Sequence, residues 1–183
     1  EISSGFQTFK TSIVSAIEMA EAAHKHDGKF SGVATGLRDI DTMIGGLHPS
    51  DLVIIAGRPS MGKTALATNI AFNAAYDYQF ETDDAGNKKT VDGAVVGFFS
   101  LEMSAEQLAS RILSEQTEIA SDKMRKGKLT NDEFDRLVVA SQQLHNLPFF
   151  IDDTPALSVS MLRTRARRLK REHGLGLVIV DYL

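Results

Sequence analysis

The sequence contains no cysteine among its 183 residues. Disulfide bonds and thiolate metal sites are therefore excluded, and a reducing compartment suits such a chain. No apolar run approaches the roughly 20 residues that a membrane-spanning helix needs, and no signal-peptide pattern is present at the start. We therefore expect a cytoplasmic protein with no membrane segment.

Positive charge is not in excess either, since the formal net charge is −4 at pH 7. This balance argues against a surface that coats nucleic acid non-specifically, although it leaves room for a few basic loops. The five histidines show no metal-ligand spacing, and we expect them at the surface. With 43% hydrophobic and 24% charged residues, the chain has the composition of a globular domain with its own core.

One glycine-rich stretch matches the pattern G-x-x-x-x-G-K-[ST], and it reads Gly57-Arg58-Pro59-Ser60-Met61-Gly62-Lys63-Thr64. Residues 52–56 before it are apolar and partly β-branched, which predicts a strand buried on both faces. Residues 65–72 after it include strong helix formers, with apolar side chains at roughly helical spacing. A strand, a glycine loop and a helix are the context that this motif requires.

Such a loop is suited to hold a polyphosphate. Its glycines let successive amide N–H groups point into one concavity, and the positive end of the helix faces the same place. The Lys63 ammonium can reach the β- and γ-phosphates, and the Thr64 hydroxyl can ligate Mg²⁺. Arg58 and Met61 either shape the loop or touch a neighbouring molecule. The stretch therefore predicts a site for a nucleoside triphosphate.

The rest of the chain alternates between strand and helix patterns. Apolar runs at 94–100, 148–152 and 177–181 predict three further strands. A short amphipathic helix is predicted before Gly45-Gly46, and further helices begin at the caps Ser104 (with Gln107), Thr130 (with Glu133) and Ser158. The short helix carries Leu37, Ile40, Met43 and Ile44 as its apolar stripe. Alternation of this kind predicts an α/β fold on a mainly parallel sheet.

Three segments leave alternatives open. Residues 10–26 read as a helix with a narrow apolar stripe, which suits packing on its own domain or on a neighbouring subunit. The polar stretch 81–93 predicts an exposed hairpin or loop, either a tolerated surface insertion or a functional element. Leu183 follows directly on a predicted buried strand, so we expect the domain to be cut short or to continue in further residues.

Two acids lie where strands of such a sheet end. Asp181 closes an apolar strand at the carboxyl edge, where open α/β sheets place their ligands. It suits a Mg²⁺ ligand, or alternatively a cap on the next loop. Glu102 follows the strand at 94–100 and suits a general base that activates water at the γ-phosphate. A first-turn acid that favours the next helix dipole is the alternative.

These motifs together resemble one family, the DnaB-type bacterial replicative DNA helicases. The glycine-rich stretch with Ala65 looks like the family's phosphate loop, and residues 100–104 resemble its catalytic glutamate segment. Residues 180–183 resemble its magnesium-binding strand end, and residues 35–47 resemble its lead-in to the core. The match covers nearly the whole chain from the helix near Lys10 onward, and the polar stretch 81–93 is the one departure.

The resemblance implies a RecA-like ATPase domain at 28–183, preceded by a linker helix region at 1–27 that docks on a neighbouring subunit. It implies a homohexameric ring with ATP between subunits, Mg²⁺ held by Thr64 and Asp181, and Lys63 and Glu102 as catalytic residues. Single-stranded DNA at the replication fork, primase and a helicase loader are the implied partners, as in a primosome. The family's arginine finger and DNA-binding loops would lie beyond Leu183, so we expect the 183 residues alone not to unwind DNA.

Two other classes remain as alternatives to a helicase motor with 5′–3′ polarity. A small-molecule kinase with the same loop would need an acceptor pocket and a basic lid. A RecA-like ATPase without a DNA partner would share the whole nucleotide site. The basic stretch 163–171 suits either a nucleic-acid patch or a solvated outer face, with Leu162, Ala166 and Leu169 inward.

Overall fold

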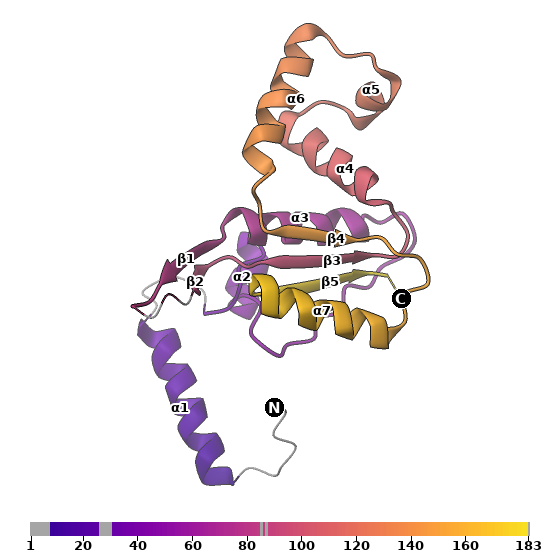
Figure 1. Cartoon of the computed structure of the whole chain (residues 1–183). Coiled ribbons are helices and arrows are strands. Elements are labelled where there is room, and N and C mark those ends of the chain that lie inside the picture. The colour runs from indigo at the N-terminus through magenta and orange to yellow at the C-terminus, as the bar shows by residue number, and fades with distance from the viewer. Residues whose placement is uncertain (1–7, 26–30, 85, 87, 183) are drawn as a thin grey trace.

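The computed structural model describes residues 8–25, 31–84, 86 and 88–182. The elements are α1 (Phe9–Lys25), α2 (Arg38–Ile44), α3 (Lys63–Tyr76), β1 (Gln79–Thr82), β2 (Lys88–Asp92), β3 (Val96–Ser100), α4 (Ala105–Thr117), α5 (Ser121–Lys126), α6 (Asn131–Leu144), β4 (Phe149–Asp152), α7 (Val159–His173) and β5 (Leu177–Asp181). Helices and strands follow one another in runs up to α6, and they alternate only from α6 to β5 (Figure 1).

A three-stranded parallel sheet lies at the centre, in the order β4-β3-β5. The middle strand β3 is buried at all five positions. Because strands of one direction end at one edge, the carboxyl ends of β3, β4 and β5 lie together, and Ser100 pairs with Asp181 in the register. The mainly parallel α/β fold predicted from the sequence is confirmed.

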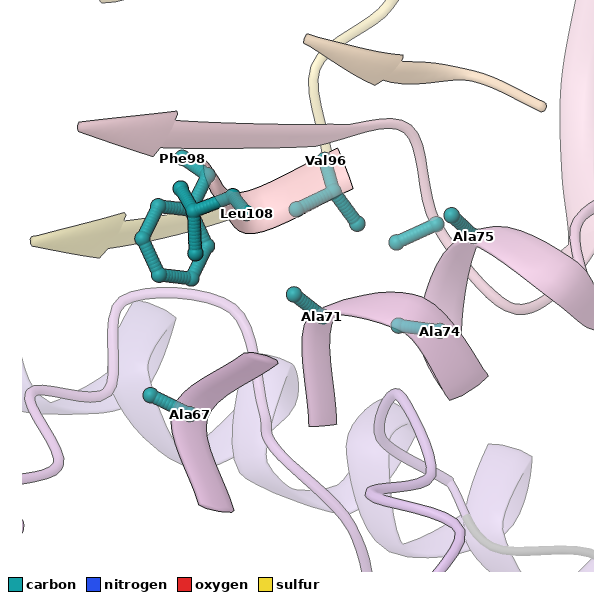
Figure 2. Close-up of a cluster of buried hydrophobic side chains, with 8 residues drawn as sticks. Ala67, Ala71, Ala74, Ala75, Val96, Phe98 and Leu108 are labelled. Atoms are coloured by element: carbon teal, nitrogen blue, oxygen red, sulfur yellow. The ribbon is translucent and has the colours of Figure 1, made fainter. Parts of the chain in front are cut away.

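Helix α3 covers one face of this sheet with a row of alanines. Ala67, Ala71, Ala74 and Ala75 pack on Val96 and Phe98 of β3, with Leu108 of α4 beside them (Figure 2). Alanine side chains are small, so α3 can lie close to β3. This packing fixes the start of α3 relative to the strand ends.

Helix α7 covers the opposite face of the sheet (Figure 1). Side chains alternate along a strand, so Gly97 faces away from Val96 and Phe98 and toward α7. A Cβ on Gly97 would lie 3.1 Å from side-chain atoms of Leu169 and of Leu175, which is tighter than ordinary contact. Leu162, Ala166 and Leu169 are half-buried on this side, as their spacing predicted.

Two parts project from the sheet and its covering helices. Helices α4, α5 and α6 extend together from one side, and both predicted capping boxes are present at Ser104 and Thr130 (Figure 1). The polar stretch at 81–93 forms most of the antiparallel hairpin of β1 and β2. This is the hairpin of the predicted hairpin or loop. The hairpin lies at the end of α3 opposite to the glycine loop, which places it away from the predicted phosphate site.

The prediction of a buried strand at 52–56 is wrong for this structure. These residues form no strand and have no ladder pairing, and Leu52 and Ile54 are 86% and 78% exposed. An apolar, β-branched run indicates that a segment suits a buried strand, but a strand forms only when a neighbouring strand pairs with it. No strand within the described residues pairs with this segment, and β5 lies at the edge of the described sheet.

The apolar stripe predicted for the short helix is also partly wrong. In α2, Met43 is 85% exposed and Ile44 is 42% exposed. The buried position is occupied by Asp41, whose carboxylate accepts hydrogen bonds from the amides of Thr35 (2.8 Å) and Gly36 (3.1 Å). The buried hydrogen bonds of Asp41 therefore help to hold α2 in place, while Leu37 and Ile40 of the predicted stripe are half-buried.

Helix α1 extends away from the sheet (Figure 1). Its apolar side chains are exposed, including Ile13 at 42% and Ile17 at 62%. Packing of this helix on its own domain, one of the two alternatives, is therefore not what the structure has. Among the described residues, no helix combines the length and the apolar character that crossing a bilayer requires.

Candidate nucleotide-binding site

The glycine-rich stretch forms the turn that leads into α3. Gly62 is the residue before the helix and has φ +86°, a backbone conformation that side chains with a Cβ rarely adopt. Lys63 is the first residue of α3, and its Nζ donates to the carbonyl oxygen of Gly57 at 3.0 Å. The lysine side chain thus folds back across the loop, where a phosphate would replace the carbonyl as its partner.

A hollow of about 480 Å³ lies over this loop. It is lined by residues 55–58 and 61–63 together with Leu66. The first amides of α3 have no carbonyl partners in their own helix, so they are free donors at this end. Donors, the helix dipole and the Lys63 ammonium together favour a bound anion in the hollow.

Asp181 lies at the tip of β5, close to the same loop. The Lys63 Nζ is 6.0 Å from the centre of the Tyr182 ring, so the residue after Asp181 reaches the phosphate loop. Asp181 is 5% exposed, and its Oδ2 is buried without any hydrogen-bond partner among the described residues. A buried carboxylate oxygen without a partner is costly. Such an oxygen is suited to a cation.

The donor set at this position fits Mg²⁺. Magnesium prefers oxygen ligands and usually keeps several waters, with one or two protein groups and phosphate oxygens completing its shell. The carboxylate of Asp181 and the hydroxyl of Thr64, in the first turn of α3, are groups of this kind. In the described part of the chain, no three His, Asp or Glu side chains gather as a metal cluster, so a cage of protein ligands alone is not formed there.

Glu102 lies two residues beyond the end of β3, in the loop before α4. Its side chain is exposed. Since Ser100 pairs with Asp181 in the parallel register, Glu102 lies at the same edge of the sheet as Asp181 and not at the opposite one. The structure thus brings the two predicted acids to the edge that also carries the phosphate loop.

Comparison with known proteins gives the family. The model of the DnaB-like helicase C-terminal domain matches residues 32–183. The chain belongs to this family. The replicative DNA helicase DnaB of Rickettsia prowazekii (strain Madrid E) is 48% identical over 174 residues, which are 94% of this chain and 35% of that protein. The chain thus spans about a third of the length of that relative.

Solved structures agree with the family assignment and with the RecA-like fold. One is an ATPase domain with a TM-score of 0.79 at 27% identity, covering 98% of this chain and 58% of that one. Another is a DnaB-like replicative helicase, described with its interactions with primase, with a TM-score of 0.74 at 26% identity. That match covers 97% of this chain and 39% of the other.

Within this DnaB-like domain, two polar residues at the strand ends escaped the sequence reasoning. The Ser100 hydroxyl bonds to the backbone of Met103, and the Asp153 carboxylate accepts from the amide of Ala105. In the sequence, Ser100 is the first residue of the stretch 100–104 that resembles the catalytic glutamate segment, and Asp153 lies in a turn after a predicted strand. A polar residue at the end of a parallel strand, or just after it, was the available signal, since such residues share one edge.

The basic helix α7 of the domain uses several of its cations in its own structure. Arg165 Nη1 lies 2.6 Å from Asp152 Oδ2, Arg168 pairs with Glu172, and Lys170 donates to the carbonyl oxygen of Leu175. These contacts support the reading of α7 as a structural helix with a solvated outer face. They give no support to a nucleic-acid patch on α7.

Proposed function

We propose that this chain is the motor domain of a replicative DNA helicase, which hydrolyses ATP to translocate on single-stranded DNA and to unwind duplex DNA at the fork. The observation that carries the proposal is the meeting of three parts at one sheet edge. These are the glycine loop with Lys63, the orphaned carboxylate oxygen of Asp181 and the exposed Glu102. Family membership adds support, because the named relatives are replicative helicases.

Each group at this edge has a chemical role in the proposal. The loop amides and Lys63 bind the phosphates of ATP, and they stabilise charge that develops on the transferred group. Thr64 and Asp181 hold Mg²⁺, which supplies further charge neutralisation when it is bound. Glu102 orients a water molecule at the γ-phosphate and accepts its proton. Arg58, Pro59, Ser60 and Met61 complete the loop that encloses the phosphates.

The assembly around the site is also a proposal. Residues 1–27 would form a linker helix region that docks on a neighbouring copy, and residues 28–183 would form the RecA-like motor domain of a homohexameric ring. The exposed apolar side chains of α1 support docking of this kind. Primase and a helicase loader are proposed partners by family resemblance. A cytoplasmic location is proposed from the lack of a signal-peptide pattern in the sequence.

The test measures ATP turnover of the whole protein with and without single-stranded DNA. Lys63→Ala should lower kcat at least about 100-fold, since a donor to the transferred phosphate is lost. Lys89→Ala is the matched control, because it removes an exposed lysine from strand β2. Normal turnover in Lys63→Ala would overturn the assignment of the phosphate loop.

The DNA dependence separates the helicase from the two alternatives. A helicase motor should hydrolyse ATP faster when an oligothymidylate is present, and it should displace a strand from a forked duplex. An ATPase without a DNA partner would show turnover with no stimulation. A small-molecule kinase would transfer the γ-phosphate to an acceptor instead of releasing phosphate.

A further inference from the structure

The loop at 101–104 carries Glu102 from the end of β3 to the start of α4. The hydrogen bonds of this loop limit the positions that the exposed carboxylate of Glu102 can take. The Ser100 hydroxyl, in a residue that is 1% exposed, donates to the carbonyl oxygen of Met103 at 2.7 Å. It also accepts from the Met103 amide at 3.2 Å. One buried side chain, just before the loop, therefore holds the backbone of Met103, the residue that follows Glu102.

The far end of the loop is tied to β4. Asp153 lies one residue beyond that strand, and its Oδ2 accepts a hydrogen bond from the Ala105 amide at 2.9 Å. Ala105 is the first residue of α4, so this bond satisfies one of the amides that the helix itself leaves free. The negative charge of Asp153 also favours the helix N-terminus.

The near end of the loop is tied to β5. The Leu101 amide donates to the carbonyl oxygen of Asp181 at 2.7 Å. The loop thus has bonds to the ends of three strands: to β3 through Ser100, to β4 through Asp153 and to β5 through Leu101. The backbone beside Glu102 is therefore fixed relative to Asp181.

We propose that Ser100 and Asp153 are positioning residues that hold Glu102 at the distance from the β5 tip that water activation requires. The proposal rests on the proposed role of Glu102 as the general base. Ser100 is buried and bonds inside the loop, and Asp153 bonds to α4, so both act through the loop. Misplacement of a catalytic group by about 1 Å can cost a factor of about 100 in rate. Loss of either tie should therefore lower turnover without weakening nucleotide binding.

The experiment compares single variants of the whole protein in ATP turnover and in binding of a fluorescent ATP analogue. Ser100→Ala and Asp153→Ala should each lower kcat about tenfold and change the analogue's Kd less than about twofold. Asp153→Asn keeps an oxygen acceptor for the Ala105 amide, so it should recover most of the rate. Ser114→Ala is the control, since its hydroxyl also bonds a backbone carbonyl, that of Ile119, but away from the loop.

A double-mutant comparison tests whether the two residues act through Glu102. Glu102→Gln should lower kcat strongly, and adding Ser100→Ala or Asp153→Ala to it should then cause little further loss. Equal losses in both backgrounds would overturn the positioning role. An Asp153→Asn variant as slow as Asp153→Ala would overturn the positioning role of the hydrogen bond to Ala105, because the charge of Asp153 would then account for the loss.

Two further results separate this proposal from the proposed function. If Glu102→Gln is slow but Ser100→Ala and Asp153→Ala both turn over normally, the positioning role fails and the general base stands. If Glu102→Gln itself turns over normally, the general-base role fails and the positioning role fails with it. Asp153 is exposed, so its variants are expected to fold. They therefore test the positioning role even if Ser100→Ala does not fold.

Discussion

At the scale of single residues, the ion pair at the end of β4 gives a test of electrostatics. Both carboxylate oxygens of Asp152 lie within 2.7 Å of Arg165 Nη1, which also donates to the Thr154 hydroxyl. Burial raises the pKa of Asp152, but hydrogen bonds from Arg165 and Thr154 outweigh it and leave the pKa below its ordinary value. The folded protein therefore favours the charged carboxylate.

Arg165→Met should lower the free energy of unfolding by about 1–2 kcal/mol at pH 7, a range limited by the partial exposure of the pair. A carboxyl group with a lowered folded pKa stabilises the fold above its unfolded pKa of about 3.9 and loses this effect as the pH falls through the folded pKa. The difference between wild type and variant should therefore shrink below about pH 4. Urea unfolding at several pH values measures it.

Arg168→Met is the matched control on the same helix. Its partner Glu172 is four residues away, and both side chains are largely exposed. Such a surface pair contributes about 0–1 kcal/mol. If Arg165→Met cost the same free energy at pH 7 and at pH 3, packing of the arginine stem rather than charge would explain the loss.

The residues of the site differ in how well the sequence predicts them. Asp181 and Glu102 were placed at one edge because parallel strands end together, and that rule needs no knowledge of contacts. The roles assigned to them stay predictions. Ser100 and Asp153 were missed because their bonds run from a side chain to a backbone group. The Asp153 bond spans 48 residues, and no local pattern encodes such a distance.

At the scale of elements, a buried carboxylate fastens α2 to the rest of the domain. Asp41 is 2% exposed and accepts from the amides of Thr35 and Gly36. The carbonyl oxygen of Thr35 in turn accepts from Asn73 Nδ2 of α3 at 3.0 Å. Through these bonds, the lead-in segment is attached to the helix that begins at the phosphate loop.

Asp41→Ala should lower the free energy of unfolding by about 2–3 kcal/mol, because it leaves the buried Thr35 amide without an acceptor. Asp39→Ala is the matched control on the same helix. Asp39 and Arg38 form a pair 3.9 Å apart with both side chains more than 90% exposed, so its loss should cost less than about 0.5 kcal/mol. Thermal or urea unfolding compares the two. An Asp41→Ala loss below about 0.5 kcal/mol, as expected for Asp39→Ala, would mean that the hydrogen bonds of Asp41 add little stability.

Elements with a clear local pattern were predicted well, but the sequence did not show which apolar segments would find a partner. Both capping boxes form as the sequence indicated, because a box is made within four residues. The segment 52–56 has the composition of a strand, but pairing requires a neighbour that lies elsewhere. Met43 shows the same limit, since helical spacing does not say what will cover an apolar side chain.

At the scale of the whole molecule, the exposed apolar surface is the main unexplained feature. Helix α1 lies apart from the sheet and presents Phe9, Ile13, Val14 and Ile17 to solvent (Figure 1). With 3.6 residues per turn, Phe9, Ile13 and Ile17 lie on one side of α1, and Thr11 and Glu18 lie on the opposite side. A stripe of this kind on a helix without a partner favours docking on another protein surface.

If α1 docks on a neighbouring copy, as proposed, removing its stripe should weaken the assembly of the whole protein. Ile13→Ser with Ile17→Ser takes away two apolar side chains, each contributing about 1.5–3 kcal/mol when buried, so the dissociation constant should rise at least about 100-fold. Thr11→Ser with Glu18→Ser changes the opposite side and should leave assembly intact. Sedimentation velocity over a concentration series measures the oligomer, and circular dichroism checks that α1 still forms. An unchanged oligomer with an intact helix would show that this stripe is not the contact between copies.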